Sequence, residues 1–445
     1  MNLRKENDRL VYTGDVNEKL SWGWVQFPWL YKMRDGNIGL YIHDAADSWA
    51  VFDGGETTGK WLVSEDKGAT WRTATPEDRA MMGTQLPNGD ILRSMPNPSM
   101  DITNVKESPS TFGNYHIPTD DLSPKKPECD DMLPNPITYC CNIFGDISKV
   151  YMLDSIPDKL CDKRFSFYRL KNGESRGNIT YSDVDWKYRT TVSFKPNRNG
   201  NDVWLYGAGL ASCRTPIVAP DGSLYIAHYR ENGTNPFTGV YEGTTNAYFL
   251  RSTDNGESWQ IVGYIPYKEP DTEKDPLAYL KKGFDEPTIA FMPDGSVLCL
   301  LRTCDVFLGS PEWGPTYITR SFDGCRTWTK PEYFTDRGAL PQLLQLKNGV
   351  TLAVITRPGI YVYASEDNGR TWNAVVEVMT DKDRSVLANN PPKKPNFHQW
   401  AGSCCNCTIL PLDDNSAILA YSDFYVECED GIKRKGIRTV EIHTK

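Results

Sequence analysis

The stretch SEDNGRTW at residues 365–372 carries a pattern that the chain repeats three more times. The other copies are SEDKGATW at 64–71, STDNGESW at 252–259 and SFDGCRTW at 321–328, where Cys325 replaces the usual Gly. An Asp in such a stretch accepts hydrogen bonds from nearby backbone N–H groups, and Gly adopts positive φ at little cost. Each copy therefore predicts a tight turn.

Strand-like runs flank these turns. WLV, YFLR, TYITR and YVYA precede the four copies, and runs such as IVGYI and AVVEV follow the last three. The Trp that closes each copy can cover the turn with a large apolar face. Each copy thus predicts a β-hairpin in which Asp, Gly and Trp have a structural role and no contact with substrate.

A second, longer repeat alternates with the first. Six segments combine a β-rich run, a turn of the Asp-Gly or Asn-Gly type and a second β-rich run; they begin at Phe27, Thr84, Arg214, Asp285, Ala339 and Cys405. Four of them precede one of the turn-and-Trp hairpins, which gives four strands per unit. Repeats of ~40–70 residues with four strands predict a β-propeller.

We therefore expect an all-β fold, a six-bladed β-propeller that forms a single domain over residues 1–445. A Pro- and Asp-rich insertion at about 97–163 interrupts the second blade, and the segment from Phe165 to Trp186 is interpreted as the outer hairpin of that blade. Seven blades are the alternative.

Composition agrees with this architecture and excludes some functions. The chain has 35 Gly, 30 Pro and 13 Trp, which suits many short strands and turns. It lacks a run of 18 apolar residues, so we expect no contact with a membrane. The net charge of −9 argues against a nucleic-acid partner. The first ten residues lack a signal-peptide core, which predicts a cytoplasmic protein, or a secreted one if a leader was removed.

Twelve cysteines include a cluster at Cys404, Cys405 and Cys407. No pair of CxxC motifs has zinc spacing. We interpret the cysteines as buried, reduced thiols, and we expect neither a metal nor a cofactor. The sequence leaves the oligomeric state open.

The two kinds of hairpin resemble the sialidase (neuraminidase) superfamily, whose turn-and-Trp repeats are called Asp-boxes or BNR repeats. The resemblance extends from about Trp24 to Ser422. It implies a propeller whose inner strands point catalytic side chains into the axial mouth. In sialidases three arginines hold the substrate carboxylate, a Tyr backed by a Glu is the nucleophile, and an Asp of the first blade is the acid.

Two arginines and one glutamate match this pattern. Glu286 begins a hairpin with an Asp-Gly turn that ends at Arg302, and Arg357 lies eight residues before Ser365 of its Asp-box. The resemblance implies that both arginines bind the substrate carboxylate, which an Arg fork can do at any working pH. The first family arginine is absent; Arg214 of the third unit is our own inference for a third cation.

The nucleophile and the acid match less well. The residues 402–407 that align with the family Tyr contain none, and we interpret Tyr421, later in that hairpin, as a packing or rim residue. The loop after the first inner hairpin holds several Asp residues. We take Asp47 as the first choice for the acid and Asp44 as the second.

Three catalytic schemes remain without the Tyr. Glu286 acts as the base on water while Asp47 or Asp44 protonates the leaving group, which needs carboxyl groups roughly 6.5–9.5 Å apart. Alternatively, Glu286 is the nucleophile, with a spacing of roughly 5–5.5 Å. In the third scheme Cys404 or Cys405 attacks as a thiolate. We rank the first scheme highest.

The sequence therefore predicts a glycoside hydrolase, exo-acting on a glycan with a carboxylate of the sialic or uronic acid type. Its partner is a carbohydrate substrate. One alternative is a polysaccharide lyase on the same fold, in which His228, also a candidate for substrate binding, carries the proton. The other is a glycan-binding propeller without catalysis.

Overall fold

The structure is a computed structural model in which almost all described secondary structure is β-strand. It describes residues 1–14, 24–44, 59–95, 106–107, 132–133, 138–141, 147–156, 163–186, 191–196, 203–206, 215–230, 233–268, 272–274, 281–305, 314–357, 359–380 and 406–444. The helical elements within these ranges are α1 (Pro76–Ala80) and the 3₁₀ turn η2 (Leu153–Ser155). No helix of the described residues has both the length and the apolarity to cross a bilayer.

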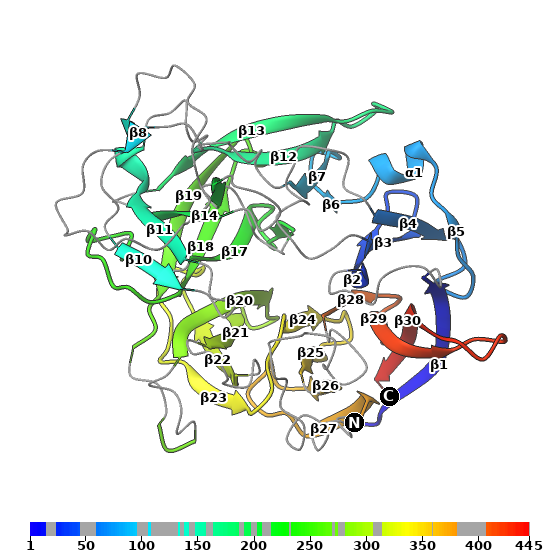
Figure 1. Ribbon diagram of the computed structural model, residues 1–445. Helices are drawn as coiled ribbons and strands as arrows, with labels where there is room; N and C mark the ends of the chain where they lie inside the picture. The colour runs from blue at the N-terminus through cyan, green and yellow to red at the C-terminus, as the bar shows by residue number, and fades with distance from the viewer. Residues whose placement is uncertain are drawn as a thin grey trace.

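Most strands of the described residues are grouped here into four-stranded units, called blades 1 to 6, which are arranged as a ring (Figure 1). Blades 2 and 3 are continuous in one eight-stranded sheet. Blade 1 contains β2 (Trp24–Lys32), β3 (Ile38–Asp44), β4 (Gly59–Ser64) and β5 (Arg72–Thr73). Blade 2 contains β6 (Thr84–Gln85), β7 (Ile91–Ser94), β12 (Phe165–Leu170) and β13 (Asn178–Asp185). Blade 3 contains β16 (Ile217–Val218), β17 (Leu224–Arg230), β18 (Asn246–Ser252) and β19 (Ser258–Ile265).

The remaining blades follow the same antiparallel order. Blade 4 contains β20 (Lys281–Phe291), β21 (Val297–Asp305), β22 (Thr316–Ser321) and β23 (Glu332–Thr335). Blade 5 contains β24 (Gln342–Gln345), β25 (Thr351–Thr356), β26 (Ile360–Ser365) and β27 (Ala374–Met379). Blade 6 contains β28 (Cys407–Pro411), β29 (Ser416–Glu427), β30 (Lys433–Thr444) and β1 (Leu3–Thr13). These results confirm the predicted all-β propeller.

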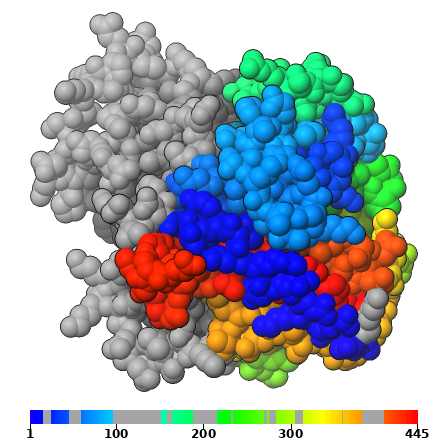
Figure 2. All heavy atoms as spheres, turned by 90° about the vertical axis from the view of Figure 1, so that its right-hand side faces the viewer, coloured from blue at the N-terminus to red at the C-terminus, as the bar shows by residue number. Residues whose placement is uncertain are grey.

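Blade 6 joins the two ends of the chain. Its outer strand is β1, which pairs antiparallel with β30 from Leu3–Thr444 to Thr13–Gly436. Figure 2 shows β1, in dark blue, lying between the light-blue segment of blades 1 and 2 and the orange and red strands of blade 6. The first strand thus completes the last blade and closes the ring.

Further strands lie in the insertion of blade 2 and in the segment after its outer hairpin. A short pair, β8 (Lys106–Glu107) and β9 (Met132–Leu133), precedes a sheet of β10 (Thr138–Cys141), β11 (Ile147–Met152), β14 (Thr191–Pro196) and β15 (Val203–Tyr206). Between β11 and β14 the chain returns to the ring, where β12 pairs with β7 and with β13. This confirms the predicted outer hairpin. The blade count stays a prediction, because β10 and β11 of the insertion join β14 and β15, which follow the outer hairpin, in an additional four-stranded sheet.

The Asp-boxes hold the outer hairpins as predicted. In all four, the Ser hydroxyl accepts a hydrogen bond of 2.7–2.9 Å from the N–H group four residues later. The Asp carboxylate accepts the N–H and the hydroxyl of a Thr or Ser at its fourth following position, as Asp367 does from Thr371. The boxes are therefore structural turns.

Each box also packs against the preceding blade. Gly369 of blade 5 has a φ of +76°, and a Cβ atom there would lie 2.6 Å from Leu298 of blade 4. In blade 4 the equivalent residue is Cys325, which keeps the left-handed backbone (φ +68°) and is buried between blades 3 and 4. Burial raises the pKa of the Cys325 thiol well above its ordinary value, so this thiol is a packing group.

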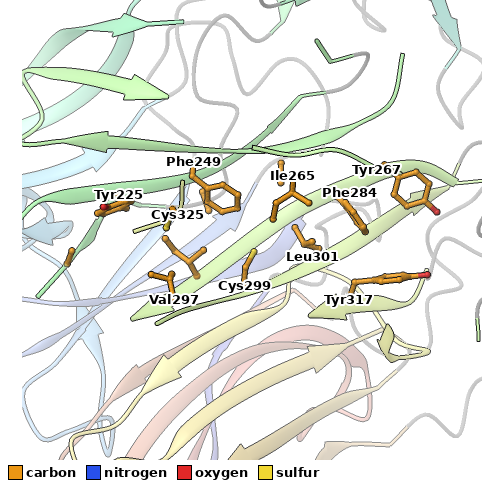
Figure 3. Close-up of a cluster of buried hydrophobic side chains, with 14 residues drawn as sticks. Tyr225, Phe249, Ile265, Tyr267, Phe284, Val297, Cys299, Leu301, Tyr317 and Cys325 are labelled. Carbon is orange, nitrogen blue, oxygen red and sulfur yellow. The ribbon is translucent and has the colours of Figure 1, made fainter. Parts of the chain in front are cut away.

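The core consists of apolar layers between neighbouring blades. Figure 3 shows the layer between blades 3 and 4, where Phe249 and Ile265 face Val297, Cys299 and Leu301. Side chains of a strand alternate between its two faces, so each inner strand contributes to two such layers. This packing fixes the blades around the axis and leaves the ends of the inner hairpins to form a site.

Candidate active site

Glu286 and Arg302 meet at the open end of the inner hairpin of blade 4. The register shifts between Asp285 and Thr288, so that the ladder has a bulge at Glu286. Glu286 precedes Pro287 and has a φ of +45°, a backbone conformation that side chains rarely adopt. Backbone strain of this kind concentrates at functional sites. The bulge places the Glu286 carboxylate 2.9 Å from Nη1 of Arg302.

Blade 5 supplies the other contacts of this carboxylate. The Leu340 N–H group, at the start of the neighbouring inner strand, donates a hydrogen bond to Oε2 of Glu286. Arg357 follows β25, is buried and also has a left-handed backbone, with a φ of +54°. Its positive charge acts on Glu286. The structure thus brings together Glu286, Arg302 and Arg357, here called the charged cluster.

The charged cluster keeps Glu286 ionised. Burial by itself would raise the pKa of this carboxyl, since its side chain is only 15% exposed. The charge of Arg302, the Leu340 N–H group and the charge of Arg357 outweigh burial and lower the pKa below its ordinary value. An ionised carboxylate can act as a base, as a nucleophile or as a partner for positive charge, but it cannot donate a proton.

Asp44 is the candidate acid that the structure describes. It ends β3 and is buried, and its Oδ2 lies 3.1 Å from Nζ of Lys60. Its buried Oδ1 has no hydrogen-bond partner within the described part of the chain. Asp44 lies eight residues after Gly36, the turn glycine of its hairpin, as Arg357 lies eight residues after Gly349. Equal positions in two blades lie at the same end of the ring, so Asp44 and Arg357 are at the same end; the role of Asp44 as the acid stays a prediction.

His228 lies between blades 2 and 3. Its buried ring is 6.4 Å from that of Phe165, centroid to centroid. Burial, together with the charge of Arg230, lowers the pKa of His228 well below 6.5, so its ring is neutral near pH 7. Neither ring nitrogen has a hydrogen-bond partner among the residues described. Its role in substrate binding stays a prediction.

Of the remaining residues discussed in the sequence analysis, the structure describes Tyr421. Asp47, Arg214, Cys404 and Cys405 lie outside the described residues. Tyr421 is buried between blades 5 and 6, and its hydroxyl donates to Asp8 of the N-terminal strand at 2.8 Å. These contacts fit the packing role that the sequence suggested for Tyr421.

Sequence reasoning missed two parts of the site. One is the Leu340 N–H group, and the other is Lys60 beside Asp44. A signal for the first is present, because Glu286-Pro287 and Leu340-Pro341 stand at the same place in successive repeats. Among the described residues, no group of three His, Cys, Asp or Glu side chains could hold a metal.

A known protein family matches the part of the chain that contains the charged cluster. The family model described as "BNR repeat-like domain" matches residues 172–427, which is more than half of the chain. The chain belongs to this family. The match includes three of the four Asp-boxes and the whole charged cluster, and it confirms the predicted relation to Asp-box propellers. No curated protein matches the chain.

Several solved structures are similar at low identity. A protein of unknown function from Dyadobacter fermentans is 16% identical, with a TM-score of 0.48 and coverage of 100% of this chain and 99% of the other. The NanB sialidase of Streptococcus pneumoniae is 12% identical, with a TM-score of 0.45 and coverage of 98% and 70%. An α-L-arabinanase of Penicillium chrysogenum is 10% identical, with a TM-score of 0.43 and coverage of 98% of each chain.

Proposed function

We propose that this member of the BNR repeat-like family is a glycoside hydrolase that acts on the end of a glycan bearing a carboxylate. One observation carries the proposal: Glu286 is held ionised between two arginines on the inner strands of blades 4 and 5. A carboxylate of fixed charge at an axial mouth is suited to stabilise the positive charge that develops on a sugar ring during glycoside cleavage.

The arginines are the binding part of the proposal. A guanidinium has five N–H donors, so Arg302 can hold Glu286 and a substrate carboxylate at the same time. Arg357 adds a second cation. The left-handed backbone of Glu286 and of Arg357 sets the direction in which each side chain leaves the chain. The net charge of −9 repels anions in general, so a local pair of arginines is needed to bind an acidic sugar.

We assign the roles of general acid and general base from the surroundings of the carboxyl groups. Glu286 cannot be the proton donor because its pKa is lowered. We assign it the role of base on water and assign the donor role to Asp44 or Asp47 of blade 1. In this inverting scheme the two carboxyl groups flank the scissile bond with room for one water molecule.

The test is turnover of aryl glycosides and acidic oligosaccharides by the wild type and by Glu286→Gln. We expect the variant to lose about 10²–10⁴-fold in kcat/KM, the usual contribution of a positioned base. Glu366→Gln is the matched control, since Glu366 is exposed in the Asp-box of blade 5.

Other results would overturn the proposal. Equal turnover by Glu286→Gln and wild type would remove Glu286 from the reaction. A product with the ultraviolet absorbance of an unsaturated uronate would show a lyase. Binding of saccharides without release of product from any substrate would show a glycan-binding propeller.

A further inference from the structure

The inner hairpins of blades 1 and 4 have the same register from the turn through the bulge, up to the pairs Gln26–His43 and Asp285–Arg302. In blade 4, Asp285 pairs with Arg302 and Thr288 with Leu300, with the bulge between these pairs. In blade 1 the corresponding pairs are Gln26–His43 and Trp29–Tyr41, again with a bulge between them. Both hairpins turn at a glycine with positive φ, and both have a proline inside the bulge. The two hairpins can therefore be compared position by position.

Phe27 occupies the position of Glu286. It precedes Pro28 and has a φ of +47°, against +45° for Glu286. Leu340 of blade 5 precedes Pro341 and has a φ of +41°. Three inner strands thus use the same left-handed residue before proline. Since the blades are related by rotation about the axis, this residue lies at the same end of the ring in each of them.

The contact of Glu286 with Arg302 also has a counterpart in blade 1. The position of Arg302 is taken by His43, and the rings of Phe27 and His43 meet edge to face, with centroids 5.5 Å apart. Blade 1 thus has an aromatic pair at the two positions where blade 4 has an ion pair. Phe27 is less buried than the residues before it. Val25 and Gln26 are fully buried, whereas Phe27 is partly exposed, as Glu286 is.

We propose that Phe27, supported by His43, is the face of the site on which a sugar ring stacks. A pyranose has a polar rim and an apolar face of C–H groups, and aromatic rings suit the apolar face. The charged cluster binds the carboxylate on the polar rim, and Phe27 packs on the apolar face from the opposite sector of the mouth. The inference rests on the proposed function, since it names the second contact of the same glycan.

The test measures Kd for acidic and neutral oligosaccharides, and KM and kcat where a substrate turns over. We expect Phe27→Ala to raise Kd and KM by about tenfold for both kinds of sugar, with a smaller change in kcat. Phe27→Tyr keeps an aromatic face and should stay within about threefold of the wild type. Phe322→Ala is the control, because Phe322 is 69% exposed and follows Ser321, which pairs with Val297 at the end of β21 away from Arg302.

The outcomes separate this inference from the proposed function. If Arg302→Ala weakens binding of acidic sugars while Phe27→Ala binds them like the wild type, the stacking role is wrong and the proposed function stands. If the wild type binds no saccharide, the proposed function is wrong, and the stacking role is wrong with it. Should Phe27→Ala fail to fold in a thermal melt, Phe27→Leu decides: it keeps an apolar side chain without a ring, and wild-type affinity for that variant contradicts stacking.

Discussion

At the residue scale, Glu286 combines backbone strain, burial and two positive neighbours. Its left-handed backbone costs free energy, and its carboxylate is largely removed from water. Arg302 and the Leu340 N–H group offset that cost while Glu286 is ionised. Without the carboxylate, two arginines would remain close together with less compensation. The charged cluster should therefore make stability depend on pH.

We expect Glu286→Gln to lower the melting temperature at pH 7 and to lose that effect in acid. The pKa of Glu286 is lower in the folded protein than its ordinary value of 4.5. Its ionisation therefore stabilises the fold fully above the unfolded pKa, and this contribution disappears as the pH falls through the folded pKa. Thermal melts from pH 7 to pH 3 check this: the difference from wild type should be constant above about pH 5 and shrink below it. A difference that grows in acid would mean a raised pKa.

At the element scale, the sequence predicts features that depend on residues close together in the chain. It does not predict features that depend on how separate hairpins are aligned. The Asp-boxes were predictable because their hydrogen bonds join residues two to four positions apart. The match of Glu286 with Arg302 followed from a spacing within one hairpin. Phe27 was not recognised, because an aromatic residue before proline is common and its role depends on comparing two hairpins in register. The choice between Asp44 and Asp47 stays open, because no local signal marks the end of this strand in the sequence and Asp47 lies outside the described residues.

The Asp-box hairpins should contribute to stability without contributing to sugar binding. Asp367 accepts hydrogen bonds from the N–H and hydroxyl of Thr371 and from the Ser365 hydroxyl. Asp367→Ala should therefore lower the free energy of unfolding by about 1–3 kcal/mol, while Kd for saccharides stays unchanged. Denaturant unfolding and sugar titration check this. Asp414→Ala is the control, because Asp414 is exposed and its side chain makes an ion pair of 3.6 Å with the exposed Lys347. Lost sugar binding in the folded Asp367 variant would give the boxes a functional role.

At the scale of the whole molecule, the proposed site depends on closure of the ring. In that proposal blade 1 supplies Phe27 and Asp44, and blades 4 and 5 supply the charged cluster, so the distance between the two sectors is set by every blade between them. The β1 strand completes blade 6 with residues from the other end of the chain. Its Asp8 side chain accepts hydrogen bonds from Tyr421 and Arg438, both at 2.8 Å. The sequence did not reveal this strand, because LRKENDRLVYT has no turn to join it to a partner.

Removal of residues 1–13 should therefore open the ring and disturb the site at the same time. The truncation exposes the edge of β30 and leaves Tyr421 and Arg438 without their Asp8 partner. We expect a melting temperature lower by more than about 10 °C, since a whole strand of pairing and packing is lost. Because the two sectors of the mouth lose their fixed separation, binding of acidic saccharides should weaken as well. A synthetic peptide of residues 1–13, added in excess, should restore both properties by pairing with β30. A peptide with the same composition in scrambled order is the control. If the truncated chain keeps the wild-type melting temperature and affinity, closure by β1 does not position the site.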